Sequence, residues 1–169
     1  TTLIMIVLVL GGCVTSAEPV TLPKIDRLRL YEEINVDPST SAQMHGAAVA
    51  SLAVGRSLGV APEADLYYIG SWTFDRDNPD PEDRTSFAYY ARAIDRILEV
   101  NRGLPAARKI RVISISVGWS LGQRGYDLIN RAAARARRAG MLVICSSVEQ
   151  VHGFRFHGLG RSPLDPPAD

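Results

Sequence analysis

The sequence predicts an α/β domain of three layers, in which helices cover both faces of a mostly parallel sheet. Short runs rich in valine, isoleucine and leucine alternate along the chain with longer helical stretches, which is the order of a β-α-β protein. The first of these runs is continuously apolar, as is typical of a parallel strand buried on both faces. Parallel strands joined through helices are expected to be connected by right-handed crossovers.

The composition is that of one soluble globular domain. The chain has 169 residues, 46% of them hydrophobic, which is enough for a sizeable core, and its mean hydropathy is close to zero. A net charge of +1 gives no overall field that attracts nucleic acid, so we expect no nucleic-acid partner. The two cysteines, Cys13 and Cys145, provide no disulfide framework. The chain begins without methionine and ends without an obvious final element, so we expect an incomplete or processed protein.

Residues 3–10 are apolar and uncharged, and two glycines end the run. The run is too short to cross a bilayer. Two interpretations are open: a buried parallel strand, or the apolar region of a signal peptide whose basic start is missing. In the second, Leu10-Gly11-Gly12-Cys13 resembles a bacterial lipobox, in which the cysteine is lipidated after cleavage. Only that interpretation predicts a secreted or cell-envelope lipoprotein that touches a membrane.

A helix is predicted at residues 44–55, after a short strand that begins at residue 28 and a turn at residues 37–41. Its alanines and other small residues make it thin enough to lie very close to its neighbours. His45 lies in its first turn, at the rim of the core, where a rigidly held imidazole is well placed for proton transfer. A histidine that only caps or packs the helix start is the alternative.

The second half of the chain continues the alternation. Residues 72–86 form a polar loop with five acidic side chains, which we expect to be solvated because their spacing does not match an EF-hand. Residues 87–102 are predicted as a helix, because apolar residues recur at three- and four-residue spacing. A strand at residues 110–117, a helix at residues 126–139 with arginines on its outer face, and a buried strand at residues 141–145 follow.

Three segments are predicted to meet at one edge of the sheet. Ligands of parallel sheets bind beyond the carboxyl ends of the strands. Val117 and Gly118 end one strand, residues 147–149 follow another, and His45 begins its helix at the matching end. The topology alone therefore predicts a site at this edge.

Three blocks of the sequence occur in the order found in subtilisin-like serine peptidases: a histidine segment, the strand that lines the substrate cleft, and the helix and strand after it. The blocks are His45-Gly46-x-x-Val49-Ala50 with Gly59-Val60-Ala61-Pro62-x-Ala64, then residues 112–118, then residues 132–144. The chain therefore resembles the N-terminal part of the catalytic domain of a divergent subtilase, over roughly residues 28–150.

This resemblance implies an incomplete subtilisin-like domain and divides the chain into three parts. Residues 1–22 are the first strand or the remnant signal and lipobox segment. Residues 23–150 are the partial peptidase domain. Residues 151–169, which are rich in glycine and proline, are a linker-like tail into a missing part.

The resemblance also implies a serine endopeptidase that cleaves extended peptides, with His45 as the general base. Ser116, Val117 and Gly118 match the strand that pairs with substrate by β-augmentation. A second set matches the wall of the first specificity pocket; it comprises Ser146, Ser147 and Val148. Glu149 occupies the family's oxyanion-binding asparagine position, where a carboxylate would oppose the developing negative charge.

Two members of the expected catalytic triad are missing from the sequence. The acid is expected near residues 10–14, but no aspartate precedes Asp26. The nucleophile is expected in a Gly-Thr-Ser-x-Ala-like turn, which nothing after residue 150 resembles; Ser162 is followed by proline. We therefore expect that this chain alone does not hydrolyse peptides.

The sequence leaves two alternative functions. A catalytically inactive subtilase that binds or regulates peptides is favoured by the missing aspartate and by Glu149. The sequence argues against the other alternative, a nucleotide-binding module, because Gly11-Gly12 is too short for a dinucleotide fingerprint. No cofactor is predicted, and weak calcium binding at the acidic loop is the one exception the resemblance allows. His152 and His157 lack a third ligand, so no metal site is assigned to them.

Overall fold

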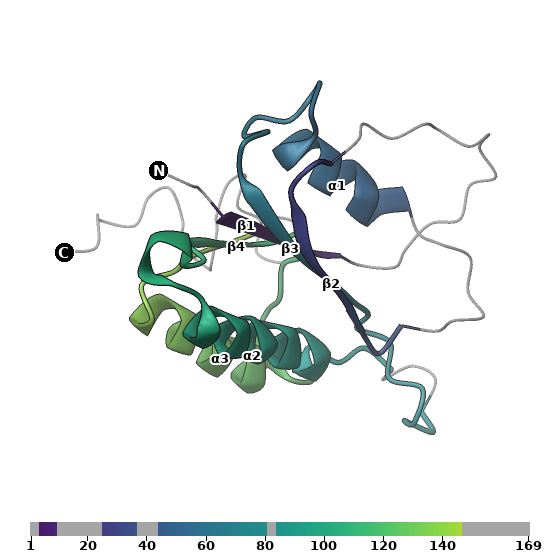
Figure 1. Ribbon diagram of the computed structural model, residues 1–169. Coiled ribbons are helices and arrows are strands. Elements are labelled where there is room, and N and C mark those ends of the chain that lie inside the picture. The colour runs from purple at the N-terminus through teal and green to yellow at the C-terminus, as the bar shows by residue number, and fades with distance from the viewer. Residues whose placement is uncertain (1–3, 10–24, 37–43, 81–83, 147–169) are drawn as a thin grey trace, which may run out of the picture.

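A computed structural model describes residues 4–9, 25–36, 44–80 and 84–146 of the chain. Five parallel strands form one sheet in the order β2-β3-β1-β4-β5 (Figure 1). The strands are β1 (Ile4–Val9), β2 (Leu28–Ile34), β3 (Asp65–Ser71), β4 (Val112–Ile115) and β5 (Leu142–Cys145). The predicted α/β class with parallel strands is confirmed.

β1 lies in the middle of the sheet and is hydrogen-bonded on both sides. Met5 is in register with Leu66 of β3 and with Val112 of β4, and Leu8 is in register with Ile69 and Ile115. Residues 4–9 thus have the strand conformation that one of the two interpretations requires. Cleavage or lipidation at Cys13 stays a prediction, because that cysteine lies outside the described residues.

Three α-helices cover the two faces of the sheet: α1 (Met44–Val54), α2 (Ala88–Gly103) and α3 (Tyr126–Arg138). Figure 1 shows α1 on one face, and α2 and α3 together on the other. The side-chain alternation of β3 explains this division, because successive residues of a strand point to opposite faces. Leu66 packs in a small cluster with α1, whereas Tyr67 and Ile69 belong to the larger core beneath α2 and α3.

The larger core lies between the sheet and the α2–α3 pair. The three- and four-residue spacing of α2 correctly predicted its inward face, since Tyr90, Ile94 and Ile97 are fully buried. The inward face of α3 is also as predicted and consists of Ile129, Ala132, Ala133 and Ala136. A short 3-10 helix at Ala106–Arg108 precedes β4. Among the described residues, no helix is long and apolar enough to span a membrane.

The crossover through α1 has the opposite hand to the other two. In the order of strands, the steps from β2 to β3, from β3 to β4 and from β4 to β5 all run in the same direction. Since α1 lies on one face and α2 and α3 lie on the other, the first connection winds around the sheet in the opposite sense. The expectation of uniformly right-handed crossovers is therefore wrong. A physical reason is that α2 already contacts β2 and β3 on its own face, so α1 packs on the other.

A buried carboxylate ties the beginning of β3 to two other segments. The Asp65 side chain is only 1% exposed, and it accepts hydrogen bonds from Arg27, Arg29 and Arg108 at 2.8–3.1 Å. Burial raises the pKa of Asp65, but the three arginines outweigh burial and hold that pKa below its ordinary value. Because removing the partners of a buried charge is strongly destabilising, this cluster fixes the amino edge of the sheet.

We predict that Ile113→Ala lowers the free energy of unfolding by about 2–5 kcal/mol, because it opens a cavity beneath α2 and α3. Ile113 is 0% exposed in β4. Ile144 of neighbouring β5 is 47% exposed, so Ile144→Ala is the matched control and should cost less than about 1 kcal/mol. Urea unfolding followed by circular dichroism measures both values, and equal losses for the two variants would contradict the assignment of the core.

Candidate active site

The carboxyl ends of all five strands lie along one edge of the sheet. Ile34 at the end of β2 is in register with Ser71 of β3, and Ile115 at the end of β4 is in register with Cys145 of β5. Val9 ends β1 between these pairs, in register with Gly70. In parallel sheets, the residues just beyond such an edge form the ligand site, so the neighbours of these strand ends define the candidate site.

His45 lies in the first turn of α1, with an exposed side chain. The last turn of α1 is fixed at the opposite edge, because Val60 N–H and Ala61 N–H donate to the carbonyls of Leu52 and Ala53 on the way to the beginning of β3. The 11 residues of α1 span about 16 Å, so its first turn lies at the end where the strands finish. Within the part of the chain that the structure describes, no carboxylate contacts the His45 ring.

Ser116, Val117 and Gly118 continue the chain beyond the end of β4. All three residues are half-buried, and Val117 packs against the larger core. Among the described residues, none of their backbone N–H or carbonyl groups forms a hydrogen bond. A stretch of unpaired backbone beside a strand end is what an extended peptide needs in order to add by β-augmentation.

The turn after Gly118 is anchored rather than free. Trp119 is buried, its Nε1–H donates to Asn130 Oδ1 of α3 at 3.0 Å, and its ring lies 6.4 Å from that of Phe87. Ser120 N–H donates to Gln123 Oε1 at 2.7 Å. These contacts hold the unpaired segment in one place, which lowers the entropic cost of binding a partner there.

Ser146 is exposed directly after β5, and its N–H donates to the carbonyl of Ile115 at 3.2 Å. This bond keeps Ser146 next to the segment that follows β4. Ser147, Val148 and Glu149 lie outside the described residues, so their predicted roles stay predictions.

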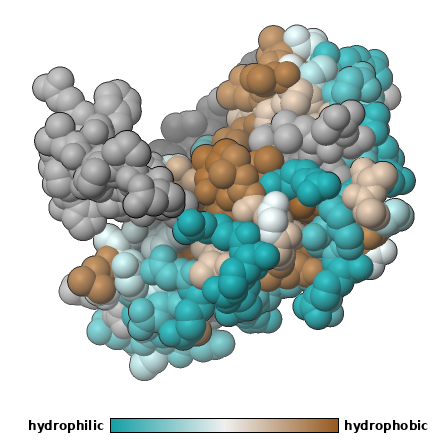
Figure 2. All heavy atoms as spheres, turned by 90° about the vertical axis from the view of Figure 1, so that its left-hand side faces the viewer, coloured by the Kyte–Doolittle hydropathy of each residue, from teal (hydrophilic) through white to brown (hydrophobic). Residues whose placement is uncertain are grey.

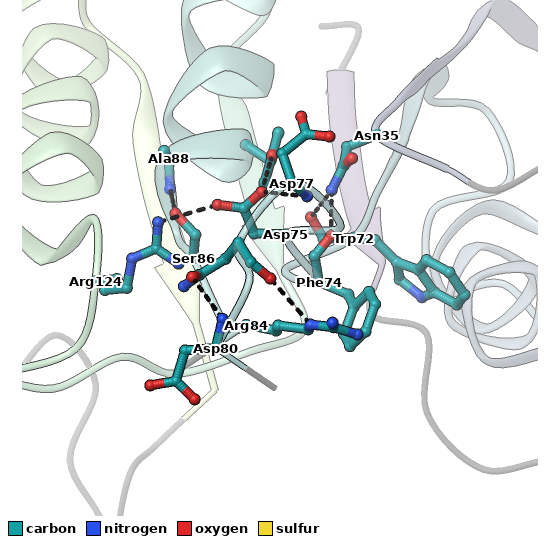
Figure 3. A network of polar contacts seen from close by, with 12 residues as sticks. Asn35, Trp72, Phe74, Asp75, Asp77, Asp80, Arg84, Ser86, Ala88 and Arg124 are labelled. Atoms are coloured by element: carbon teal, nitrogen blue, oxygen red, sulfur yellow. Dashed lines mark hydrogen bonds and ion pairs between the residues drawn. The ribbon is translucent and has the colours of Figure 1, made fainter. Parts of the chain in front are cut away.

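The loop between β3 and α2 is pinned at the same edge by Asp75, which Figure 3 shows at the centre of a polar network. Asp75 accepts hydrogen bonds from Tyr89 Oη and Arg124 Nη2, both at 3.0 Å, and its side chain is 15% exposed. Asp75 N–H donates to the carbonyl of Arg84, and Phe74 bridges Thr85 in antiparallel fashion. The sequence predicts that the acidic side chains of this loop are solvated, and for Asp75 that expectation is wrong.

Asn35 joins this loop to the end of β2. Its φ of +58° is the left-handed conformation that asparagine tolerates better than most residues. Its Nδ2 donates to the carbonyls of Phe74 at 2.7 Å and Trp72 at 3.5 Å. Figure 3 shows the Trp72 indole pointing away from the Asp75 network. Sequence reasoning missed Asn35, Asp75 and Arg124, since the partners lie far apart in the chain and only the αL preference of asparagine gave a signal.

A family model described as the subtilase family matches residues 27–166, which is most of the chain. The chain belongs to the subtilase family. No curated protein and no solved structure matches it significantly.

For a subtilase, the functional class at family level is a hydrolase of the serine-peptidase kind, and its substrates are peptides or proteins. The predicted base and the predicted peptide-pairing segment of this subtilase both lie at the carboxyl edge of one sheet. Within the described residues, no three histidine, cysteine or acidic side chains come together as metal ligands would. Weak calcium binding at the acidic loop stays a prediction.

We predict that Asp75→Asn makes the stability of this subtilase less sensitive to acid. Partial burial raises the pKa of Asp75, but hydrogen bonds from Tyr89 and Arg124 outweigh burial and lower that pKa below its ordinary value. A carboxylate whose pKa is lowered by folding stabilises the protein above its unfolded pKa of about 3.9, and this contribution is lost as the pH falls below that value. The variant should be less stable at neutral pH and should lose less stability on acidification.

Urea unfolding between pH 7 and pH 3 measures this difference. The matched control is Asp77→Asn, which removes a carboxylate from the same loop at an exposed position and should barely change stability at neutral pH. Parallel pH profiles for Asp75→Asn and the parent chain would contradict the role assigned to the network.

Proposed function

We propose that this chain is the histidine-bearing part of a serine endopeptidase domain that cleaves extended peptides. The observation that carries the proposal is the position of His45 at the edge where Ser116, Val117 and Gly118 follow β4, with backbone groups that pair with none of the described residues. A general base is one of the four parts that acyl transfer needs, and the peptide-pairing segment would hold the substrate beside it. The other three parts are a nucleophile, a group that orients the base, and donors for the oxyanion.

We also propose that polypeptide outside residues 1–169 completes a three-layer subtilisin-like domain. The support is an apolar surface on the α1 face of the sheet. Leu142 and Ile144 of β5 are 59% and 47% exposed there, while Val143 between them is buried toward α3. On the outer side of α1, Leu52 is 60% exposed. Apolar side chains so exposed on one face of an edge strand are typical of a surface that another part of the protein covers.

In this proposal His45 removes the proton from a serine that lies outside residues 1–169. No serine in the sequence stands in the turn that the family uses, and no aspartate precedes Asp26 to orient the imidazole. The chain by itself therefore binds extended peptides without hydrolysing them. Glu149 stands at the oxyanion-binding position, so backbone N–H groups would have to supply the oxyanion donors.

A catalytically inactive subtilase that binds peptides is the second candidate. It is favoured by the absence of any carboxylate contact to His45 among the described residues and by the acid at position 149. The two candidates share the peptide-pairing segment and differ only in whether the complete protein contains a reactive serine.

We predict that diisopropyl fluorophosphate labels no serine of the purified chain, as read by intact-protein mass spectrometry. A longer chain that includes a triad serine should be labelled at that serine and should hydrolyse a fluorogenic peptide. In that chain, His45→Ala should lower kcat by about 10⁴-fold or more, because the serine loses its base. The matched control, His152→Ala, should leave kcat unchanged. Labelling of the 169-residue chain would refute the prediction that this chain lacks a nucleophile. A longer chain that remains unlabelled would favour the inactive subtilase.

We predict that an extended decapeptide binds along Ser116, Val117 and Gly118 and protects their amides from hydrogen exchange, as measured by NMR. Gly118→Val should weaken this binding by about tenfold, because a branched side chain obstructs the approach of a second backbone. The control is Gly103→Val at the end of α2, where an added Cβ meets nothing within 4 Å. Protection confined to the outer edge of β2 would overturn the assignment of the segment.

A further inference from the structure

The opposite edge of the sheet, where the strands begin and the helices end, is strongly basic. Figure 2 views the molecule from the side at which β1 begins, and hydrophilic residues cover much of the lower part of this face. The basic side chains that the chain order places at this edge are Arg27, Arg29, Arg56, Arg102, Arg108, Lys109, Arg111, Arg137 and Arg138. The acidic ones are Asp26, Glu63 and Asp65. Because the whole chain carries a net charge of only +1, positive charge is concentrated here.

Three of these arginines converge on the buried Asp65. Arg27 and Arg29 come from the beginning of β2, and Arg108 comes from the short helix before β4. Arg27 and Arg29 each donate through Nε to Oδ1, at 2.9 and 2.8 Å, and Arg108 donates through Nη2 to Oδ2 at 3.1 Å. The carboxylate thus fixes three guanidinium groups from two separate parts of the chain.

The cluster carries more positive charge than burial of one carboxylate requires. A single arginine can neutralise a carboxylate with two parallel hydrogen bonds, and here three arginines surround one. Among the described residues, the other acid that contacts the cluster is Glu63, which is 93% exposed and lies 3.4 Å from Arg27. The arginine side chains remain 33%, 38% and 51% exposed, so the excess charge faces solvent.

Most hydrogen-bond donors of this cluster have no acceptor among the described residues. Arginine has five N–H groups, and Arg29 and Arg108 each use one of them within the described residues. Neither side chain caps a helix end. Lys109 does that for α2, through Nζ to the carbonyls of Asn101 and Arg102 at 2.6 and 3.2 Å. Stabilisation of helix ends therefore does not explain Arg29 and Arg108.

We propose that Arg27, Arg29 and Arg108, ordered by Asp65, form a binding site for an oxyanion, either a carboxylate of an acidic peptide or a phosphate group. The guanidinium fork matches both groups with paired, charge-assisted hydrogen bonds. The buried carboxylate holds the forks in place, so less side-chain entropy is lost when the anion binds. The site lies on the edge opposite to His45, and it does not depend on the proposed peptidase function.

The test titrates the chain, at low ionic strength, with inorganic phosphate in one arm and with an acetylated hexaglutamate peptide in the other. NMR follows the Nε–Hε signals of the arginines. Either probe should shift the signals of the cluster to saturation. Saturation by phosphate alone identifies a phosphate site, and saturation by the peptide alone identifies an acidic-peptide site.

Arg108→Gln should weaken the binding of the active probe by about tenfold, because one charged hydrogen-bonding partner is lost. Arg27 and Arg29 still neutralise Asp65 in this variant, so the fold should persist, as checked by circular dichroism. Arg135→Gln is the matched control, because Arg135 of α3 pairs with Asp95 of α2, away from the cluster, and its replacement should not affect affinity. If neither probe saturates the parent chain, or if Arg108→Gln binds as tightly as Arg135→Gln, the proposal is wrong.

Discussion

The hydrogen bonding of β1 to both β3 and β4 holds the two halves of the sheet together. β1 is the only described strand that joins the β2–β3 pair to the β4–β5 pair. Its two ladders set the register of every other strand, so they also decide that all the strand ends share one edge. The first turn of α1 and the segment after β4 lie at the same edge because this central strand aligns the two halves of the sheet.

Much of this architecture follows from local patterns in the sequence. The spacing of Tyr90, Ile94 and Ile97 predicted the inward face of α2, and the alternation of strand and helix segments predicted the parallel sheet. The hand of the α1 crossover did not follow from the sequence, since it depends on which face α2 already occupies. Local patterns also do not distinguish Asp75 from the other acids of its loop, because its partner Arg124 is 49 residues away.

Family membership and geometry contribute different parts of the functional picture. Membership in the subtilase family gives the class of reaction and the general nature of the substrate. Geometry contributes the exposed imidazole of His45 and a backbone segment after β4 that pairs with none of the residues the structure describes. It also adds Asn35 and Asp75, which hold the neighbouring loop against the ends of β2 and the beginning of α3.

Because α1 packs on the face of the sheet opposite to α2 and α3, the two hydrophobic clusters can change independently over evolutionary time. The sheet separates the small hydrophobic cluster beneath α1 from the larger core beneath α2 and α3, and no described residue belongs to both. Substitutions in the larger core can therefore accumulate without disturbing the packing of α1, which carries His45. Homologous sequences are then free to diverge widely while the packing of α1 is retained.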